Sequence, residues 1–210
     1  MNFILIVFIS SIQALPLYLG IFSNEQNDAK VYMRLKVLDA VKILMNHYPQ
    51  DENVQYMYYE LINNKTYRTP PNLHITTFYI GDNKDAEQSE YYKNFTVNLA
   101  QEMRIYAVAL LPKRVIACVV KRQDYAVPIE NKFPHMTTLL GNWTAVDSNV
   151  LMASLFDEYG PLNNIYQSLF QQSEIKVYST LINGKGEKNL PAYVVKMPLL
   201  LEGETQYGLQ

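Results

Sequence analysis

One pattern occurs twice in this chain, as LHITTFYIG at residues 73–81 and as FPHMTTLLG at residues 133–141. Each copy is a run of apolar and β-branched residues that carries His-x-Thr and ends in glycine, which is typical of a β-strand that stops at a turn. Side chains two residues apart in a strand point to the same face. Each strand is therefore predicted to project one histidine and one threonine from the same side: His74 with Thr76, and His135 with Thr137.

Two such strands lying side by side would bring two imidazoles and two hydroxyls together. This set suits a phosphate, because the hydroxyls donate to its oxygens and the imidazoles give and take protons near neutral pH. Taken singly, either histidine fits a structural role in a half-buried strand. Two of the three histidines in the chain stand in nearly identical frames, however, and we interpret them as a functional pair. The opposite faces of the strands, which include Thr77 and Thr138, are expected to pack elsewhere.

The paired His-x-Thr strands resemble those of the two-histidine (2H) phosphoesterase superfamily, and this resemblance covers most of the chain. Residues 114–151 resemble, more narrowly, the cyclic phosphodiesterase domain of fungal-type tRNA ligases. The narrower resemblance is carried by three stretches: VIACVV at 115–120, NKFPHMT at 131–137 and DSNVL at 147–151.

The resemblance implies metal-independent hydrolysis of a 2',3'-cyclic phosphate, at an RNA 3' end or on a nucleotide, to a 2'-phosphate. It implies that His74 is the general acid and His135 the general base, while Thr76 and Thr137 hold the non-bridging phosphate oxygens. The sequence itself leaves the orientation of the two histidines open. No cofactor is expected.

Two alternatives stay open at this stage. The same site could act on another phosphodiester, such as a 2',5'-linked oligonucleotide or a cyclic nucleotide by-product. The chain could also be a secreted nucleotide-binding or RNA-binding glycoprotein without turnover, although intact histidines and threonines in both motifs favour turnover.

Thr77 and Thr138 depart from the family pattern, which often has a large aliphatic residue there. No carboxylate lies within either motif, so no metal site is expected, and Cys118 is interpreted as a small buried hydrophobe.

Composition is that of an ordinary globular protein. The chain has 210 residues, 49% of them hydrophobic and 18% charged, enough for one core or two small lobes that share an interface. A formal net charge of −2 argues against a broad electrostatic binder of long nucleic acids. A small site for an RNA end or a nucleotide needs only a few local cations and is not excluded. We expect a monomer.

The composition of the N-terminal residues is typical of a targeting segment. Residues 1–22 contain no charged side chain, and residues 3–9 are almost wholly apolar, as in the core of a signal peptide or an N-terminal anchor. Three Asn-x-Thr sequons follow, at Asn64, Asn94 and Asn142. We therefore predict entry into the secretory pathway and a secreted glycoprotein that has no stable membrane contact once the signal is removed.

Hydrophobic periodicity predicts an α+β fold in one domain at 23–201, followed by a loose tail at 202–210. The expected shape is two-lobed and 2H phosphoesterase-like, with antiparallel sheets around a central groove and flanking helices. His47 is assigned a structural role at the end of the first helix. Helices are expected over 37–48, 92–99, 148–156 and 162–169. Besides the motif strands, strands are expected over 54–62, 104–111, 114–121, 175–182 and 192–198.

Overall fold

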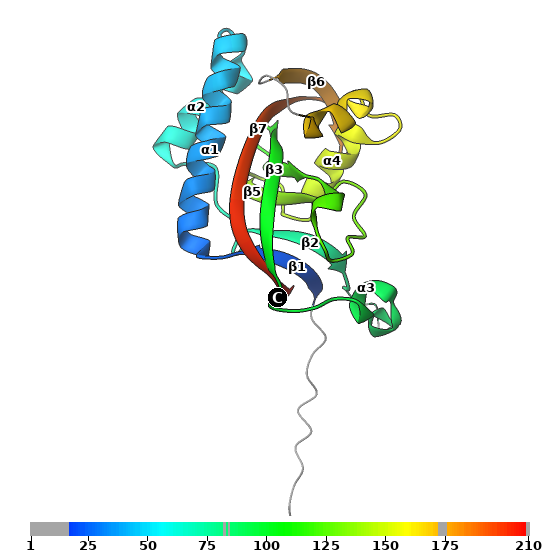
Figure 1. Ribbon diagram of the computed structural model, residues 1–210. Coiled ribbons are helices and arrows are strands. Elements are labelled where there is room, and N and C mark those ends of the chain that lie inside the picture. The colour runs from blue at the N-terminus through cyan, green and yellow to red at the C-terminus, as the bar shows by residue number, and fades with distance from the viewer. Residues whose placement is uncertain (1–16, 82, 84, 172–175, 209–210) are drawn as a thin grey trace, which may run out of the picture.

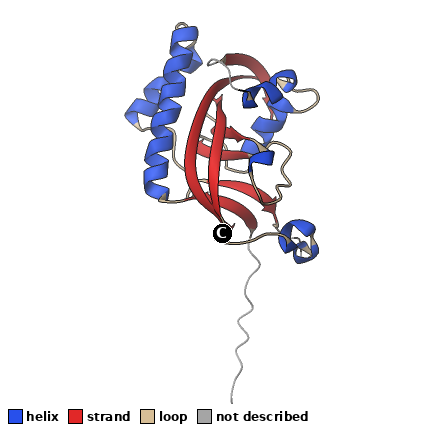
Figure 2. Ribbon diagram, in the orientation of Figure 1, coloured by secondary structure: helices blue, strands red, loops and turns tan. Residues whose placement is uncertain are grey.

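The computed structural model describes residues 17–81, 83, 85–171 and 176–208. These residues form an α+β fold, in which helices cover both faces of one seven-stranded antiparallel sheet (Figures 1 and 2). The strands are β1 (Tyr18–Ser23), β2 (His74–Tyr79), β3 (Ala100–Leu111), β4 (Val115–Val120), β5 (His135–Leu140), β6 (Val177–Gly184) and β7 (Glu187–Gly208). The helices are α1 (Gln26–His47), α2 (Glu52–Asn63), α3 (Glu90–Lys93) and α4 (Ser148–Phe156). Short 3₁₀ turns are η1 (Ala86–Gln88), η2 (Arg122–Asp124), η3 (Asn163–Ile165) and η4 (Gln167–Phe170).

The strand order is β1-β2-β5-β4-β3-β7-β6, and β1 also pairs with β7. This extra pairing closes six strands into a ring. The long strand β7 makes the closure, because its first part pairs with β6 and its last residues, 203–208, pair with β1. Figure 1 shows β7 curving around the other strands. The two motif strands, β2 and β5, are neighbours in this sheet.

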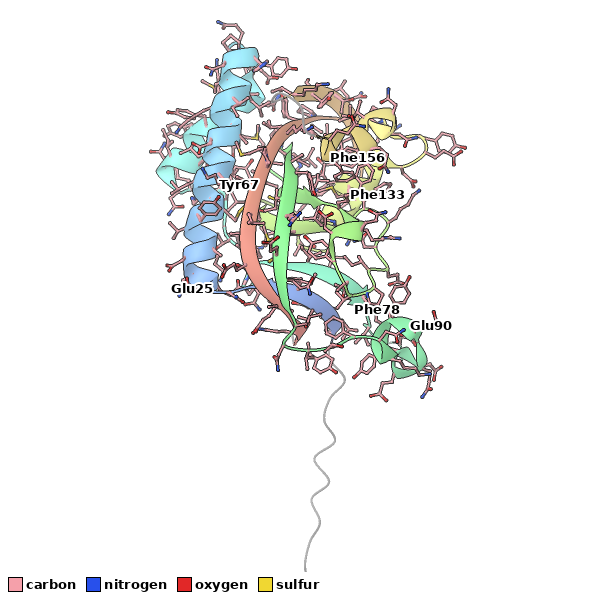
Figure 3. The ribbon with its side chains drawn as sticks, viewed as in Figure 1. Glu25, Tyr67, Phe78, Glu90, Phe133 and Phe156 are labelled. Atoms are coloured by element: carbon pink, nitrogen blue, oxygen red, sulfur yellow. The ribbon has the colours of Figure 1, made fainter. Side chains whose placement is uncertain are left out.

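The two faces of the sheet carry different cores because side chains alternate along each strand. On one face, buried residues of β3 and β4 such as Val108 and Cys118 pack against α1 and α2. On the other face, Ala107, Ala109 and Ala117 pack against α4 and the turns that follow it. These alanines leave room for α4 to approach the sheet closely. Figure 3 labels Tyr67 near α1 and Phe133 with Phe156 on the α4 side.

The strand predicted over 54–62 is wrong, since these residues lie in α2. The Asp51 side chain caps this helix by accepting hydrogen bonds from two backbone N–H groups of its first turn. Val54, Met57 and Leu61 recur at helical spacing and are buried against the sheet. The tyrosines in this segment favour strands by propensity, but the apolar spacing and the cap determine the helix.

The helix predicted over 37–48 is real but begins earlier, at Gln26. Its buried residues continue the same face toward the N-terminus through Met33 and Ala29. His47 is the last residue of α1, and its Nδ1 lies 2.9 Å from the carbonyl oxygen of Ile43. The structural role predicted for His47 agrees with this position.

Both predicted boundaries of the folded domain need correction. Residues 18–22 belong to β1 rather than to a leader, and Leu19 and Ile21 are fully buried in the main core. Residues 202–208 are not a loose tail, because they form the end of β7 and pair with β1 and β3. The apolar run at 3–9 lies outside the described residues. None of the described helices is long and apolar enough to cross a membrane.

Of the remaining secondary-structure predictions, some are confirmed and two are wrong. The hairpin predicted over 104–111 and 114–121 is confirmed as β3 and β4, and the last two predicted strands as β6 and a longer β7. The helix predicted from residue 148 is confirmed as α4. The helices predicted over 92–99 and 162–169 are wrong in length or type, because they shrink to the four-residue α3 and to the 3₁₀ turns η3 and η4.

Candidate functional site

The register between the two motif strands brings the two His-x-Thr pairs together. Ile75 of β2 pairs with Met136 of β5 in an antiparallel ladder, and both are fully buried in the core beneath α1. The residues on either side of this pair therefore face the opposite side of the sheet, toward α4. The ladder places each histidine opposite the threonine of the other motif: His74 opposite Thr137, and His135 opposite Thr76.

The two histidines share one hydrogen-bonding arrangement. Nδ1 of His74 lies 3.2 Å from the carbonyl oxygen of Asn72, and Nδ1 of His135 lies 2.8 Å from the carbonyl oxygen of Phe133. A carbonyl oxygen can only accept, so Nδ1 carries the proton in both rings. Each imidazole therefore presents Nε2 as the nitrogen left for proton transfer.

The first half-site, His74 with Thr76, is half-buried beside aromatic rings of β1. The His74 ring lies 4.6 Å from the Tyr18 ring and 5.1 Å from the Phe22 ring, with nearly parallel planes. Gly20 lies between these two residues in the strand, and a Cβ there would be 3.7 Å from Cδ2 of His74. The tighter contacts of such a Cβ would be 3.1 Å to the Ile75 carbonyl oxygen and 3.2 Å to Cε2 of Phe22, so glycine avoids crowding beside the histidine rather than in its place. Residues 18–22 were predicted to belong to a leader, so this wall was not expected from the sequence.

The second half-site, His135 with Thr137, lies under the first residue of α4. Nε2 of His135 is 2.7 Å from Oγ of Ser148, and Oγ1 of Thr137 is 2.8 Å from the same atom. His135 and Thr137 are only 8% and 9% exposed, and Ser148 is fully buried. From the sequence, Ser148 was expected only at the start of a helix and within the stretch 147–151 that shares the narrower family resemblance, with no contact to the motif predicted.

Burial dominates the electrostatics of both histidines. Packing against Tyr18 and Phe22 desolvates the His74 ring and lowers its pKa, although part of the side chain stays exposed. Burial lowers the pKa of His135 to about 4, the hydrogen bond to Phe133 opposes this shift, and the charge of His74 adds to it. Both imidazoles are therefore neutral at pH 7. A bound phosphate would raise both pKa values, because a nearby negative charge favours the imidazolium form.

The four threonines of the motifs divide as the strand alternation predicts. Thr76 is half-buried, and its hydroxyl has no hydrogen-bond partner among the described residues. Thr77 and Thr138 are each 1% exposed and lie away from the histidines. Oγ1 of Thr138 is 3.2 Å from Sγ of Cys118, which is fully buried as predicted.

A hollow of about 450 Å³ lies beside the second half-site. Phe133, whose carbonyl holds His135, forms part of its wall together with Tyr166 and Lys132. The Phe133 and Tyr166 rings meet edge to face at 5.1 Å, and Figure 3 shows Phe133 close to Phe156 of α4. Within the described part of the chain, no group of three or more His, Cys, Asp or Glu residues could hold a metal ion.

Comparisons with known proteins complete the description of the site. No family model matches the sequence, and no curated protein matches it. Among solved structures, the crystal structure of a fungal RNA kinase is similar over 96% of this chain, with a TM-score of 0.49 and 12% sequence identity. The chain spans about half of that solved chain, 47% of its length.

Proposed function

We propose that the face carrying the two His-x-Thr pairs binds phosphate and hydrolyses a cyclic phosphodiester. The substrate class is a 2',3'-cyclic phosphate at an RNA 3' end or on a nucleotide, and the product is a 2'-phosphate. One observation carries the proposal: the Ile75–Met136 pairing puts two imidazoles and two hydroxyls on one face of neighbouring strands. On this proposal the chain is a two-histidine phosphoesterase, and the two halves of its closed sheet correspond to the two lobes.

In the proposed reaction, Nε2 of neutral His135 takes a proton from water, whose oxygen attacks the phosphorus. The bond from phosphorus to the ribose O3' breaks, and Nε2–H of protonated His74 gives its proton to that oxygen. The hydroxyls of Thr76 and Thr137 donate to the non-bridging oxygens and hold the phosphorus in line. The strongly lowered pKa of His135 suits the base, since the base has to be neutral at the start.

Aromatic side chains flank the site at both ends and favour a nucleoside over a small alkyl phosphodiester. Tyr18 and Phe22 line the first half-site, and Phe133 and Tyr166 line the hollow beside the second. Tyr18 and Tyr166 are half-buried and present ring surface on which a base can stack with little sequence preference, whereas Phe22 and Phe133 are buried behind them. Lys132 borders the same hollow, but it is ion-paired with Asp157, and Glu158 also lines the hollow, so the aromatic rings rather than a local cation favour the nucleoside.

A binding protein without turnover is the second candidate, and the closed second half-site favours it. Nε2 of His135 is engaged by Ser148 and the side chain is 8% exposed, so the site as it stands does not offer this nitrogen to a ligand.

Incubation of the purified protein with a panel of cyclic and linear phosphodiesters separates the two candidates, with products followed by ³¹P NMR in the presence and absence of a chelator. We expect a 2'-phosphate from a 2',3'-cyclic nucleotide and no effect of the chelator. Retention of a nucleotide without product would favour the binding protein, and activity restored by added zinc would contradict a metal-independent reaction.

We also propose that the chain is secreted and glycosylated. The asparagines of the three sequons, Asn64, Asn94 and Asn142, are exposed and can accept a glycan without unfolding. The test is expression in a eukaryotic secretion host, followed by digestion with an N-glycosidase. A mobility shift that disappears when the three asparagines are replaced by glutamine supports the proposal, and an unglycosylated intracellular product contradicts it.

A further inference from the structure

The Ser148 hydroxyl has three hydrogen-bonding neighbours at one point of the second half-site. Its Oγ lies 2.7 Å from Nε2 of His135, 2.8 Å from Oγ1 of Thr137 and 2.5 Å from the carbonyl oxygen of Ala145. The proposed reaction assigns the first of these neighbours to the attacking water and the second to a phosphate oxygen. Ser148 is fully buried, so it is no nucleophile for an external substrate.

While His135 is neutral, the Ser148 hydroxyl is the donor that its imidazole needs. The proton on Nδ1 goes to Phe133, so Nε2 has to accept, and Ser148 Oγ is the group in contact with it. The carbonyl of Ala145 has other donors, because the backbone N–H of Ser148 lies 3.3 Å from it and Oγ1 of Thr137 lies 3.4 Å from it. In the imidazolium form Nε2–H would instead donate to Ser148, and burial disfavours that charged form.

A phosphate oxygen can take over the contacts that the Ser148 hydroxyl makes. It accepts only, so it can take the hydrogen bond of the Thr137 hydroxyl and, once His135 has taken up its proton, that of Nε2–H. Its negative charge also favours the imidazolium that supplies the second of these bonds. The Ser148 hydroxyl would then be free to donate to the carbonyl of Ala145 alone.

We propose that the Ser148 hydroxyl occupies the place that a phosphate oxygen takes on binding, and that a phosphodiester enters the second half-site by displacing it. This inference rests on the proposed function and adds a gating residue to it. Ser148 is a positioning residue rather than a catalytic one, since it acts through His135 and Thr137.

The displacement is local to the start of α4. Leu151 and Leu155 hold the body of the helix in the core and are fully buried. The turn before the helix is tied by Asp147, which accepts two hydrogen bonds from Thr144 and forms an ion pair with Lys185. Because both the helix and this turn are held, rotation of the Ser148 side chain is the movement required.

The test is a titration of ¹⁵N-labelled protein with inorganic phosphate, in which the imidazole signals of His135 are followed. Ser148→Ala removes the hydroxyl and leaves the helix, so phosphate no longer competes with it. We expect about tenfold tighter binding of phosphate, the effect of one hydrogen bond of about 1.4 kcal/mol. Ser154→Ala is the matched control, because its Oγ lies on the same helix and donates to the carbonyl of Asn183 at 2.9 Å. This control should bind phosphate like the wild type.

Unchanged or weaker phosphate binding by folded Ser148→Ala protein would overturn the inference. Should that variant not fold, the wild type gives the answer, because phosphate should shift the backbone amide signals of residues 145–149 together with His135. A His135 shift without those amide shifts would overturn the inference. Tighter phosphate binding by Ser148→Ala without hydrolysis by either protein would support the gate and refute the proposed function. Hydrolysis by the wild type with equal phosphate affinity in both proteins would refute the gate alone.

Discussion

The two His-x-Thr half-sites are alike in sequence and in the way each histidine holds its Nδ1 proton, yet their surroundings differ. His74 is half-buried, with its ring beside Tyr18 and Phe22. His135 is nearly inaccessible, and Ser148 engages the nitrogen that His74 keeps without a partner among the described residues. Each motif determines that its residues form a strand, on which face of the sheet its histidine lies, and that Nδ1 of this histidine carries the proton. The segments that pack over each motif determine how exposed its histidine is and whether Nε2 of that histidine has a hydrogen-bond partner.

The difference follows from where the chain goes after each strand. After β5 the chain turns within a few residues and sets the first residue of α4 over His135. After β2 it leaves through η1 and α3, and the flank of His74 is covered by β1, which comes from the other end of the sequence. One half-site is therefore closed by a local helix and the other is lined by a distant strand. Changes to each half-site should have different consequences.

The largest effect should come from removing either imidazole. We expect His74→Ala and His135→Ala each to lower turnover of a 2',3'-cyclic nucleotide by roughly two to four orders of magnitude, the usual range for one general acid or base. Steady-state kinetics and melting temperature measured together separate chemistry from folding. His47→Ala is the control, because His47 lies at the end of α1 and should leave turnover unchanged. Near wild-type turnover in either folded variant would mean that the reaction does not need both imidazoles, which the proposal requires.

The buried half-site should make stability depend on pH. His135 has a pKa of about 4 in the folded protein, against about 6.5 in the unfolded chain. Between these values the unfolded chain takes up a proton that the folded protein does not, so the free energy of unfolding falls as the pH falls from 6.5 to 4. The loss should reach about 3 kcal/mol.

Urea unfolding at pH 7, 5.5 and 4 measures this loss, with His135→Gln as the comparison. The variant cannot titrate at this position and should show a correspondingly flatter profile. Parallel profiles for the two proteins would mean that His135 is not desolvated in the folded state.

The threonine hydroxyls should matter less than the imidazoles. Thr→Val keeps the shape and removes the donor, so at Thr76 or Thr137 it should weaken transition-state binding by roughly 1–3 kcal/mol. The same change at Thr77 or Thr138, which are buried away from the histidines, should leave kinetics nearly intact. Turnover and melting temperature of the four single variants decide this. Greater sensitivity at 77 and 138 would mean that the other face of the strands binds the ligand.

The smallest effect should come from the aromatic wall of the first half-site. Tyr18→Leu removes the ring that lies 4.6 Å from His74, and we expect a roughly three- to tenfold loss of turnover because the imidazole is held less firmly. Tyr79→Leu is matched to it, since Tyr79 pairs with Tyr18 across the strands but is 56% exposed. Kinetics at saturating substrate compare the two variants. Equal losses would mean that the stacking on His74 has no role in turnover.

The motif strands could be predicted from the sequence, but little of what surrounds them could. Alternation predicted β2 and β5 and the faces of Thr76 and Thr77, because a two-residue period is visible in a single strand. The strand β1 was missed because its residues continue an apolar run, and a leader and a buried strand share that composition. The contact between Ser148 and His135 joins a helix to a strand through the tertiary fold. No periodicity encodes such a contact, so only the structure reveals the closed half-site.

The central claim is that the two half-sites act on one phosphate, and a double-mutant cycle tests it most directly. Turnover of a 2',3'-cyclic nucleotide is measured for the wild type, His74→Ala, His135→Ala and the double variant. If the imidazoles act as a unit, the double variant should lose little more than the worse single variant, far less than the product of the two losses. Losses that multiply would show that the histidines act independently, and turnover that survives in the double variant would place the chemistry elsewhere in the chain.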